Sequence, residues 1–308
     1  MTEKPTACLS EKILRDLGEP TVIVITGPTA SGKSALAIDL ARRLDTEILS
    51  ADSRQIYKGI PIVTAMPTPE ERSQVRHHLI DMLPLDAYYS ASEFERDALA
   101  IARRLLDERG TAIVCGGSMM YVDAFCNGID DLPSVPDSIR NSLMEEHRHK
   151  GDEWLLERLR DLDPAYFNEV DQKNIKRVFH AVEISITAHR PYSSLRTGYK
   201  KKRDFRIVKY CLDMPREVLF ARINSRVDRM VEAGLEEEAR SVYHLRELNS
   251  LNTVGLKELF DYFDGKMDRH TAIERIKKNT RVYAKKQITW WKRDPDIIPL
   301  SWNDASEL

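Results

Sequence analysis

The chain has 308 residues, 42% of them hydrophobic, and a formal net charge of −2, which bound it to one large domain or two modest ones with a buried core. No apolar run approaches the length of a membrane span, and the first residues lack the basic segment followed by an apolar segment that marks a signal peptide. We therefore expect a cytoplasmic protein. The four cysteines lack paired or metal-ligand spacing and are expected to be reduced: Cys8, Cys115, Cys126 and Cys211.

The sequence predicts a strand, a phosphate-binding loop and a helix over residues 21–44. Residues 22–25 form an apolar β-branched run that predicts a buried strand, and leucines at helical spacing follow the loop. Backbone N–H groups, the helix dipole and Lys33 can surround a phosphate chain there, while Ser34 can offer its hydroxyl to Mg²⁺. The loop consists of Gly27, Pro28, Thr29, Ala30, Ser31, Gly32, Lys33 and Ser34. It predicts a di- or triphosphate ligand; a glycine turn that binds nothing is the alternative.

Strands and helices alternate in the next part of the chain. Residues 46–52 predict a second strand, 90–110 a long helix that ends at Gly110, and 111–117 a third strand. This alternation predicts an α/β fold with a P-loop NTPase-like parallel sheet core flanked by helices. Because such sheets bind ligands at the carboxyl ends of their strands, Gly27, Asp52 and Gly117 are expected to share one cleft.

Asp52 is the candidate functional carboxylate of this cleft. It follows the second strand, which we expect beside the phosphate loop, and it could hold a magnesium-bound water or accept a proton. An aspartate that only caps a turn is the alternative. An ordinary phosphate-loop NTPase has an acid for Mg²⁺ at a strand end where this chain has Gly116, Gly117 and Ser118. These glycines could let backbone approach a ligand or could form a plain tight turn.

The pattern changes after Gly128. Helices are expected over 138–149, 152–162 and 174–188, and a strand over 204–214 is the last one that we expect. The chain should therefore consist of an amino-terminal extension (1–20), a core (21–132 and 204–294), an inserted all-helical module (133–203) and a loose tail (295–308).

Three arginines of the second half recur at helical spacing. Arg222, Arg226 and Arg229 should share one face, which could grip a leaving diphosphate or form ion pairs with Glu232 or Glu236.

Basic and aromatic residues mix near the carboxyl terminus. Residues 275–293 carry eight Lys or Arg and no acid, interleaved with Tyr283, Trp290 and Trp291. Either RNA binding by phosphate contacts and base stacking or an amphipathic helix that buries its aromatics fits this segment. The adjacent His77 and His78 have no third ligand at helpful spacing, so no zinc site is expected.

Six sequence blocks together resemble the tRNA dimethylallyltransferases. In chain order they are GPTASGKS, SADSRQIYKG, HHLID, GGSMMYVDAFCNGIDDLP, RINSRVDRMVEAGLEEE and TRVYAKKQITWWKRD. The resemblance covers residues 21 to about 293. It implies transfer of a dimethylallyl group from dimethylallyl diphosphate, held by the loop, to the exocyclic N6 amine of the adenosine 3′ of the tRNA anticodon (position 37), which gives N6-(dimethylallyl)adenosine and diphosphate. No hydrolysis occurs in such a transfer, which accounts for a strand end without an acid.

The resemblance also implies site residues and partners. Asp52 would be the general base, Thr29 would bond the bridging diphosphate oxygen, and Arg226 would grip the diphosphate, with Ser34 at Mg²⁺. The macromolecular partner would be the anticodon stem-loop of tRNA, held by the inserted helices of a monomeric enzyme without membrane contact. The implied tRNA contacts are Asp52, Ser53, Arg54, Gln55, Ser118, Arg140, Lys176, Arg177, Val178, Phe179, His180, Asn252, Thr253, Val254, Gly255, Leu256 and Lys257.

The chain departs from the family pattern at positions expected to face RNA. Residues 63–67 correspond to a common GTAKP motif but carry Val63 and Met66. Residues 180–184 correspond to a common RALEV motif but begin with His180. Residues 255–256 correspond to a common GY pair but carry Leu256 after Gly255. These departures bear on the choice of tRNA more than on the prenyl chemistry.

Two rival functions share the phosphate loop. One is an ATP-dependent kinase, against which the missing strand-end acid argues. The other is an RNA-binding module with a merely structural loop, which the intact Lys33 and Ser34 disfavour.

Overall fold

The fold is described from a computed structural model that places residues 10–14 and 20–301. The chain divides into two compact units. Unit 1 comprises the described residues up to Cys126 and from Arg203 onward, and unit 2 comprises Asn127–Lys202. Unit 2 is continuous in sequence and interrupts unit 1 once, close to the insertion predicted over 133–203.

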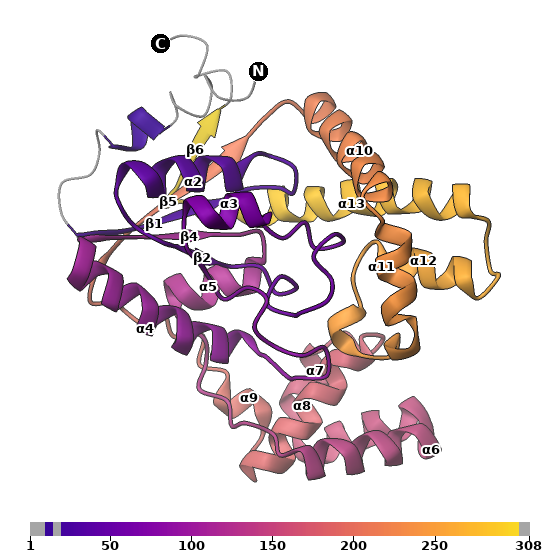
Figure 1. The fold of residues 1–308 in the computed structure, drawn as a ribbon. Coiled ribbons are helices and arrows are strands. Elements are labelled where there is room, and N and C mark those ends of the chain that lie inside the picture. Colours follow the sequence, from indigo (N-terminus) through magenta and orange to yellow (C-terminus); the bar gives the residue numbers. More distant parts are fainter. Residues whose placement is uncertain (1–9, 15–19, 302–308) are drawn as a thin grey trace. The chain divides into compact units, whose positions relative to one another are not determined.

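Unit 1 is built on a parallel sheet, which has six strands within the described residues in the order β3-β2-β4-β1-β5-β6 (Figure 1). The strands are β1 (Thr21–Thr26), β2 (Ile48–Ser50), β3 (His77–His78), β4 (Thr111–Cys115), β5 (Arg206–Asp213) and β6 (Ile297–Ser301). The central strand β1 pairs with β4, where Thr21 lies opposite Thr111, and with β5, where Thr21 lies opposite Arg206. The predicted parallel α/β sheet is thus confirmed.

Hydrophobic layers cover both faces of the sheet, because alternate residues of a strand point to opposite faces. Ile23 and Ile25 pack with α2 (Lys33–Arg43) on one face. Val22 and Val24 pack with α4 (Ala91–Arg109) and α5 (Met119–Asn127) on the other. All four β1 residues are completely buried, as a strand of a doubly covered parallel sheet should be.

The long helix α4 begins and ends where the sequence predicts. The Ser90 hydroxyl accepts a hydrogen bond from the Glu93 N–H, and the Glu93 carboxylate accepts one from the Ser90 N–H, which together form a capping box. Gly110 ends the helix with a φ of 72°, a conformation that glycine adopts without a Cβ penalty. The helix predicted over 90–110 is confirmed.

The carboxyl-terminal part of unit 1 is helical. Its helices are α10 (Arg216–Glu232), α11 (Leu235–Val242), η1 (Tyr243–Leu245), η2 (Asn249–Leu251), α12 (Leu256–Phe263) and α13 (Arg269–Trp291), and a short α3 (Pro69–Gln74) lies earlier in the chain. The long α13 contacts both α10 and α12 (Figure 1). Ile56, Tyr57 and Ile60, which follow Asp52, pack into one hydrophobic cluster with α10–α13. This cluster holds the segment after β2 against the carboxyl-terminal helices.

Unit 2 is all-helical. It contains α6 (Asp137–Leu162), α7 (Pro164–Glu169), α8 (Ile175–Ala188) and α9 (Tyr192–Leu195). Gly151, with φ 80° and ψ −175°, interrupts α6, which agrees with the two separate helices predicted on either side of it. Leu155 and Leu159 of α6 are completely buried against Val178 and Val182 of α8. None of the helices within residues 10–14 and 20–301 has the length and apolarity needed to span a membrane.

One prediction about the sheet is wrong. Strand β6 lies within the segment predicted as a loose tail and pairs with β5, with Tyr210 opposite Ile298, so 204–214 is not the last strand. Strand β4 lies between β1 and β2. Only Leu300 of β6 is buried, and an edge strand that also contains Pro299 gives a weak strand signal.

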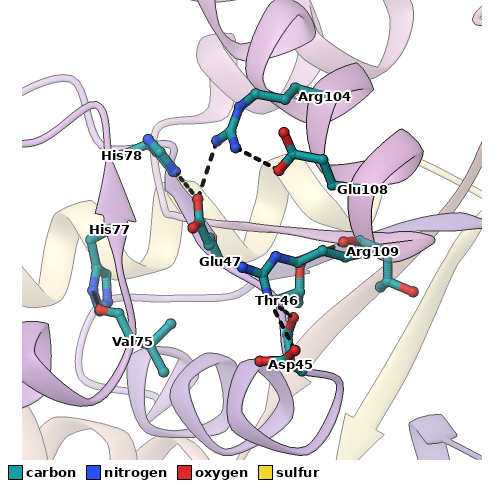
Figure 2. A network of polar contacts seen from close by, with 10 residues as sticks. Asp45, Thr46, Glu47, Val75, His77, His78, Arg104, Glu108 and Arg109 are labelled. Atoms are coloured by element: carbon teal, nitrogen blue, oxygen red, sulfur yellow. Dashed lines mark hydrogen bonds and ion pairs between the residues drawn. The ribbon is translucent and has the colours of Figure 1, made fainter.

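A charged network lies beside β3 at the edge of the sheet (Figure 2). One Glu47 carboxylate oxygen lies 2.6 Å from His78 Nε2 and 3.2 Å from Arg104 Nη2, and Arg104 also pairs with Glu108 at 2.9 Å. The Glu47 side chain is only 14% exposed. Burial alone would raise the pKa of Glu47, but the hydrogen bonds from His78 and Arg104 outweigh it, so the pKa lies below its usual range.

We expect Glu47→Gln to lower the free energy of unfolding by about 1–3 kcal/mol at neutral pH, because it removes the partly buried carboxylate that bonds to both His78 and Arg104. Since the native pKa is lowered, Glu47 stabilises the fold above its unfolded-state pKa, and this contribution is lost as the pH falls through the native pKa. Chemical denaturation at a series of pH values should therefore give a difference from the wild type that shrinks towards acid.

The matched control for this network is Glu108→Gln, which removes the half-exposed partner of Arg104 and should cost less than about 1 kcal/mol. A Glu47→Gln difference that stays constant down to about pH 3 would contradict the stabilising role assigned to the ionised carboxylate.

Candidate active site

A cavity of about 370 Å³ lies at the carboxyl ends of β1, β2 and β4, a size in the range of small-molecule sites. Its polar lining comes from Thr29, Lys33 and Ser34 after β1, from residues 52–55 after β2, and from residues 116–118 after β4. Cys115 at the end of β4 and both polar and apolar residues of α10, α11, α13 and the segments 63–65 and 252–255 complete the lining. The prediction that the phosphate loop, Asp52 and Gly117 share one cleft is confirmed.

The phosphate loop offers donors to this cavity. α2 begins at Lys33 directly after Gly32, and its first turn has neither a side-chain cap nor an acidic residue. The first N–H groups of the helix can therefore serve an anion. Lys33 Nζ donates to the Pro28 carbonyl oxygen at 3.4 Å, and burial lowers the pKa of Lys33 against the opposing effect of Asp52. An anion bound beside Lys33 would favour its charged form.

Asp52 both caps a turn and lines the cavity. Its Oδ1 accepts hydrogen bonds from the N–H groups of Arg54 at 2.9 Å and Gln55 at 3.4 Å. Within the described residues, the hydrogen bonds of this carboxylate use Oδ1 and leave Oδ2 for a ligand. The two interpretations of Asp52 are therefore compatible, because the turn fixes the carboxylate while one oxygen stays available.

Two glycines bring the end of β4 close to its neighbours. A Cβ at Gly116 would lie 2.1 Å from the Ala51 carbonyl oxygen, and one at Gly117 would lie 2.4 Å from Gln287 Nε2. Ser118, which is 8% exposed, accepts a hydrogen bond from the Ser53 N–H at 2.8 Å. The packing of the protein itself thus requires bare glycines here, and it joins the ends of β2 and β4 around the cavity.

The arginine face of α10 borders the phosphate loop. Arg222, Arg226 and Arg229 line a second cavity together with Lys33 and Ser34, and Arg226 lines the first cavity as well. Their common face, predicted from helical spacing, is confirmed. Burial lowers the pKa of Arg226, while the nearby Asp52 acts in the opposite direction; a guanidinium remains charged even so.

One of the acidic partners proposed for these arginines is engaged elsewhere. Glu236 pairs with Arg269 at 2.7 Å and with Arg240 at 3.6 Å. Both of these arginines lie outside the two cavities. The arginine face is therefore not neutralised by Glu236.

Most of the predicted tRNA-contact positions in unit 1 line the first cavity. They are Asp52, Ser53, Arg54, Gln55, Ser118, Asn252, Thr253, Val254 and Gly255. Arg54 Nη2 donates to the Asn252 carbonyl oxygen at 3.4 Å, which joins two of these segments. Gln55 Nε2 donates to the carbonyl oxygens of Thr64 and Ala65, both at 3.1 Å, so this side chain supports the loop that carries the departure at Val63.

Two predicted contact positions have buried side chains. Leu256 at the start of α12 and Val178 in α8 are both 0% exposed and belong to the hydrophobic cores of their units. Neither side chain is therefore exposed for contact with RNA. Val178 follows the exposed Lys176 and Arg177, and Leu256 precedes the exposed Lys257, but in each helix the apolar residue faces the core.

The predicted contact positions of unit 2 gather on α6 and α8. Arg140 Nε donates to the Glu183 carboxylate at 3.0 Å, and His180 Nδ1 lies 2.9 Å from the same group. Burial alone would raise the pKa of Glu183, but the bonds from His180 and Arg140 lower it below its usual range. Lys176 and Arg177 are exposed, and Phe179 is half-buried. His180, at the departure from the family pattern, thus shares an acid with Arg140.

α13 supplies one face to the cavity. Ile276, Thr280, Tyr283 and Gln287 recur at helical spacing and all line it. The Tyr283 hydroxyl donates to the Gly117 carbonyl oxygen at 3.4 Å, and burial, with Asp52 nearby, raises the pKa of Tyr283 to about 12. Sequence reasoning noted Tyr283 but missed the other three, although their spacing from it was visible.

The tryptophans of α13 do not face the cavity. Trp291 is 3% exposed in the hydrophobic core, and Trp290 Nε1 donates to the Asp123 carboxylate at 3.0 Å. Of the two interpretations of this segment, burial of aromatics holds for the tryptophans. Tyr283 alone of the three aromatics lines the cavity.

Three of the cysteines are free: Cys115, Cys126 and Cys211. Cys8 lies outside the described residues. Burial raises the pKa of Cys115 to about 11, so its thiol is protonated at neutral pH. Cys115 nevertheless lines the cavity, a position that its place in an apolar strand did not reveal.

The oxygen groups beside the phosphate loop fit a Mg²⁺ ion held chiefly by a bound phosphate. Mg²⁺ binds through one or two protein oxygens plus phosphate oxygens and water. The exposed Ser34 hydroxyl and the Asp52 carboxylate line the first cavity. In the part of the chain that the structure describes, no group of three His, Cys, Asp or Glu side chains could hold a metal by itself.

The fold and the cavity together define a phosphate-loop protein of the α/β class with a helical insertion. A family model described as IPP transferase matches residues 55–294. The chain belongs to this family, and curated relatives that it matches over most of its length are named tRNA dimethylallyltransferases. The resemblance inferred from the six sequence blocks is confirmed.

Individual relatives are similar along nearly the whole chain. The chain is 50% identical over 277 residues to tRNA dimethylallyltransferase 2 of Parabacteroides distasonis, which covers 90% of this chain and 93% of that one. It is 50% identical over 278 residues to tRNA dimethylallyltransferase 1 of Bacteroides thetaiotaomicron, 90% of each.

Solved structures of the family are similar as well. One is the full-length tRNA isopentenylpyrophosphate transferase of Bacillus halodurans, with 32% identity, a TM-score of 0.68 and 94% of each chain covered. Another is a eukaryotic dimethylallyltransferase acting on tRNA, with 27% identity, a TM-score of 0.79, and 93% of this chain and 75% of that one covered.

Proposed function

We propose that this enzyme transfers a dimethylallyl group from dimethylallyl diphosphate to the N6 amine of adenosine 37 of tRNA. The observation that carries the proposal is a single cavity that joins a phosphate loop, a carboxylate and an apolar wall. The phosphate loop and the apolar wall suit the two ends of an allylic diphosphate. The carboxylate suits an amine nucleophile that loses a proton.

The apolar wall distinguishes a prenyl donor from ATP. It consists of Val63, Val227, Met230, Leu235, Val254 and Ile276. Five carbons without a polar group match such a wall, because burying them there removes apolar surface from water. A kinase would instead need an acid at the end of β4 to hold Mg²⁺ on a triphosphate, and Gly116 and Gly117 stand there.

Four polar side chains of the cavity have roles in the transfer. As the bond between the prenyl C1 and the diphosphate oxygen breaks, the bonding electron pair leaves with the diphosphate, whose growing charge Lys33, Thr29 and Arg226 stabilise. The N6 nitrogen forms the new bond to C1 and releases one proton, which Asp52 accepts. Diphosphate and the alkylated adenosine are the products, so atoms and charge balance without water.

Mg²⁺ completes the donor site. Ser34 would hold it together with diphosphate oxygens and water, and when bound it neutralises charge on the leaving group. The protein groups nearest to that charge, Lys33 and Arg226, both line the cavity.

The nucleobase must leave its stack to enter the cavity. This costs a few kcal/mol, less in a loop than in a duplex. Arg54 and Asn252 offer polar contacts at the cavity, and the exposed Lys176 and Arg177 of unit 2 offer phosphate contacts to the anticodon stem-loop. We infer that a monomer acts on tRNA in the cytoplasm.

The test supplies the purified protein with unmodified tRNA and either labelled dimethylallyl diphosphate or γ-labelled ATP. We expect label from dimethylallyl diphosphate to enter the RNA, and none to enter a matched tRNA with guanosine at position 37. Phosphate transfer from ATP would support the kinase instead, and binding without turnover would support an RNA-binding module.

A further inference from the structure

Gln287 of α13 joins the two loops that carry the phosphate-binding and base-binding sides of the cavity. Its side chain is 1% exposed. Its Oε1 accepts a hydrogen bond from the Thr29 N–H at 2.9 Å, and its Nε2 donates to the Gly117 carbonyl oxygen at 2.8 Å. Thr29 belongs to the loop after β1, and Gly117 precedes Ser118 in the turn after β4. One side chain, distant from both in sequence, therefore connects them.

A glutamine amide is the group that suits this position. The site needs an acceptor towards Thr29 and a donor towards Gly117, whereas a carboxylate offers only acceptors and an ammonium only donors. Because the amide is buried, an unsatisfied partner would be costly. The space is fixed as well, since a Cβ at Gly117 would lie 2.4 Å from Nε2.

The bond to Thr29 also decides which N–H groups of the phosphate loop are available to a ligand. The Thr29 N–H is directed to Gln287, so the N–H groups that remain for a diphosphate come from later in the loop and from the first turn of α2. The Thr29 hydroxyl, which lies on the same residue, is thereby set relative to Lys33. On its other side, Gln287 fixes the turn whose Ser118 bonds to Ser53 beside Asp52.

We propose that Gln287 is a positioning residue for prenyl transfer. By bonding to both Thr29 and Gly117, it fixes the position of the leaving-group side of the cavity relative to the nucleophile side. It acts through these two backbone groups and not on the reacting atoms. The proposal rests on the proposed function, because it assigns Gln287 to that reaction. Misplacement of reacting groups by about 1 Å can cost about 10²-fold in rate.

The test compares Gln287→Glu and Gln287→Met across a pH series, each relative to the wild type at the same pH. We expect Gln287→Met to lower kcat about 10–100-fold, with a smaller change in KM and a ratio to the wild type that does not depend on pH. At about pH 8.5 Gln287→Glu should be as slow as Gln287→Met, because its ionised carboxylate repels the Gly117 carbonyl oxygen. Burial beside the Gly117 carbonyl oxygen should raise the pKa of the introduced carboxyl above its usual range. Towards about pH 5.5 its protonated form can then accept from Thr29 and donate to Gly117, so its kcat should rise above that of Gln287→Met.

This recovery separates a hydrogen-bonding role from a charge effect. Removal of a negative charge alone would bring Gln287→Glu only up to the level of Gln287→Met. Lys277→Met is the matched control on the same helix: it removes ion pairs with Asp228 and Glu274 outside the cavity and should leave kcat unchanged. Thermal unfolding of each variant checks that the fold is retained.

A wild-type kcat in Gln287→Met, or a Gln287→Glu that stays at or below Gln287→Met at every pH, would overturn the proposal. Failure of the proposed function is a different outcome, namely no transfer by the wild type. In that case the affinity for inorganic pyrophosphate, measured by calorimetry across the same pH series, tests the positioning of the loop. A pyrophosphate affinity that is lower in Gln287→Met than in the wild type, and that recovers in Gln287→Glu towards acid, supports the proposal. Equal affinities in the wild type and both variants refute it.

Discussion

Asp52→Asn is expected to lower kcat for prenyl transfer by about 10²–10⁴-fold, the usual contribution of a positioned general base. The amide oxygen of asparagine can still accept the hydrogen bonds from Arg54 and Gln55 that Oδ1 accepts in the wild type, so the turn after β2 should persist. What is lost is the basic oxygen that takes the proton of the amine. Affinity for tRNA, measured by filter binding, should change less than about threefold.

Two further variants sharpen this result. Asp52→Ala removes the turn cap as well and should lower both kcat and stability. Asp261→Asn makes the same charge change at an exposed carboxylate that pairs with Lys266, and it should leave kcat unchanged. A kcat of Asp52→Asn near that of the wild type would end the assignment of Asp52 as the base.

Arg226→Ala is expected to lower kcat/KM for the prenyl donor by about 10²–10³-fold, the range found when one preorganised donor to a developing anion is removed. Arg226 is the arginine of its face that lines both cavities. Its burial in the free enzyme lowers its pKa, and a diphosphate would restore the missing partner charge. Arg226→Lys should recover only part of the loss, because an ammonium lacks the planar fork of donors.

The measurement pairs steady-state kinetics with calorimetric binding of pyrophosphate. Both donor kcat/KM and pyrophosphate affinity should fall in Arg226→Ala, while tRNA affinity stays near the wild-type value. Arg216→Ala is the control on the same helix, where the guanidinium stacks 5.1 Å from the Phe220 ring centre and away from both cavities. Equal kinetics for Arg226→Ala and Arg216→Ala would remove Arg226 from the diphosphate site.

Features fixed within a few residues of sequence were predictable. The phosphate loop, the ends of α4 at Ser90 and Gly110, and the break of α6 at Gly151 all follow from local backbone geometry and hydrogen bonding. The common face of Arg222, Arg226 and Arg229 follows from helical spacing alone. The alternation of strands and helices predicted the α/β class, and the six sequence blocks indicated the family.

Features that depend on which distant segments meet were not predictable. The placement of β4 between β1 and β2 and the pairing of β6 with β5 were missed, because an extended segment does not specify its neighbour. The burial of Val178 and Leu256 required the orientation of whole helices. Gln287 lies 258 residues from Thr29 in sequence, and nothing local to either residue indicates the other.

The sequence by itself therefore determined the chemistry carried by short segments: an anion-binding loop, a carboxylate after a strand, and a row of guanidinium groups. The sequence also predicted that the loop and the carboxylate share one cleft, but the tertiary structure alone decided that this cleft has an apolar wall and that Gln287 bonds to both of its sides. The physical reason is that hydrogen bonding and helical periodicity act over a few residues, whereas a cavity is made by packing between segments far apart in the chain.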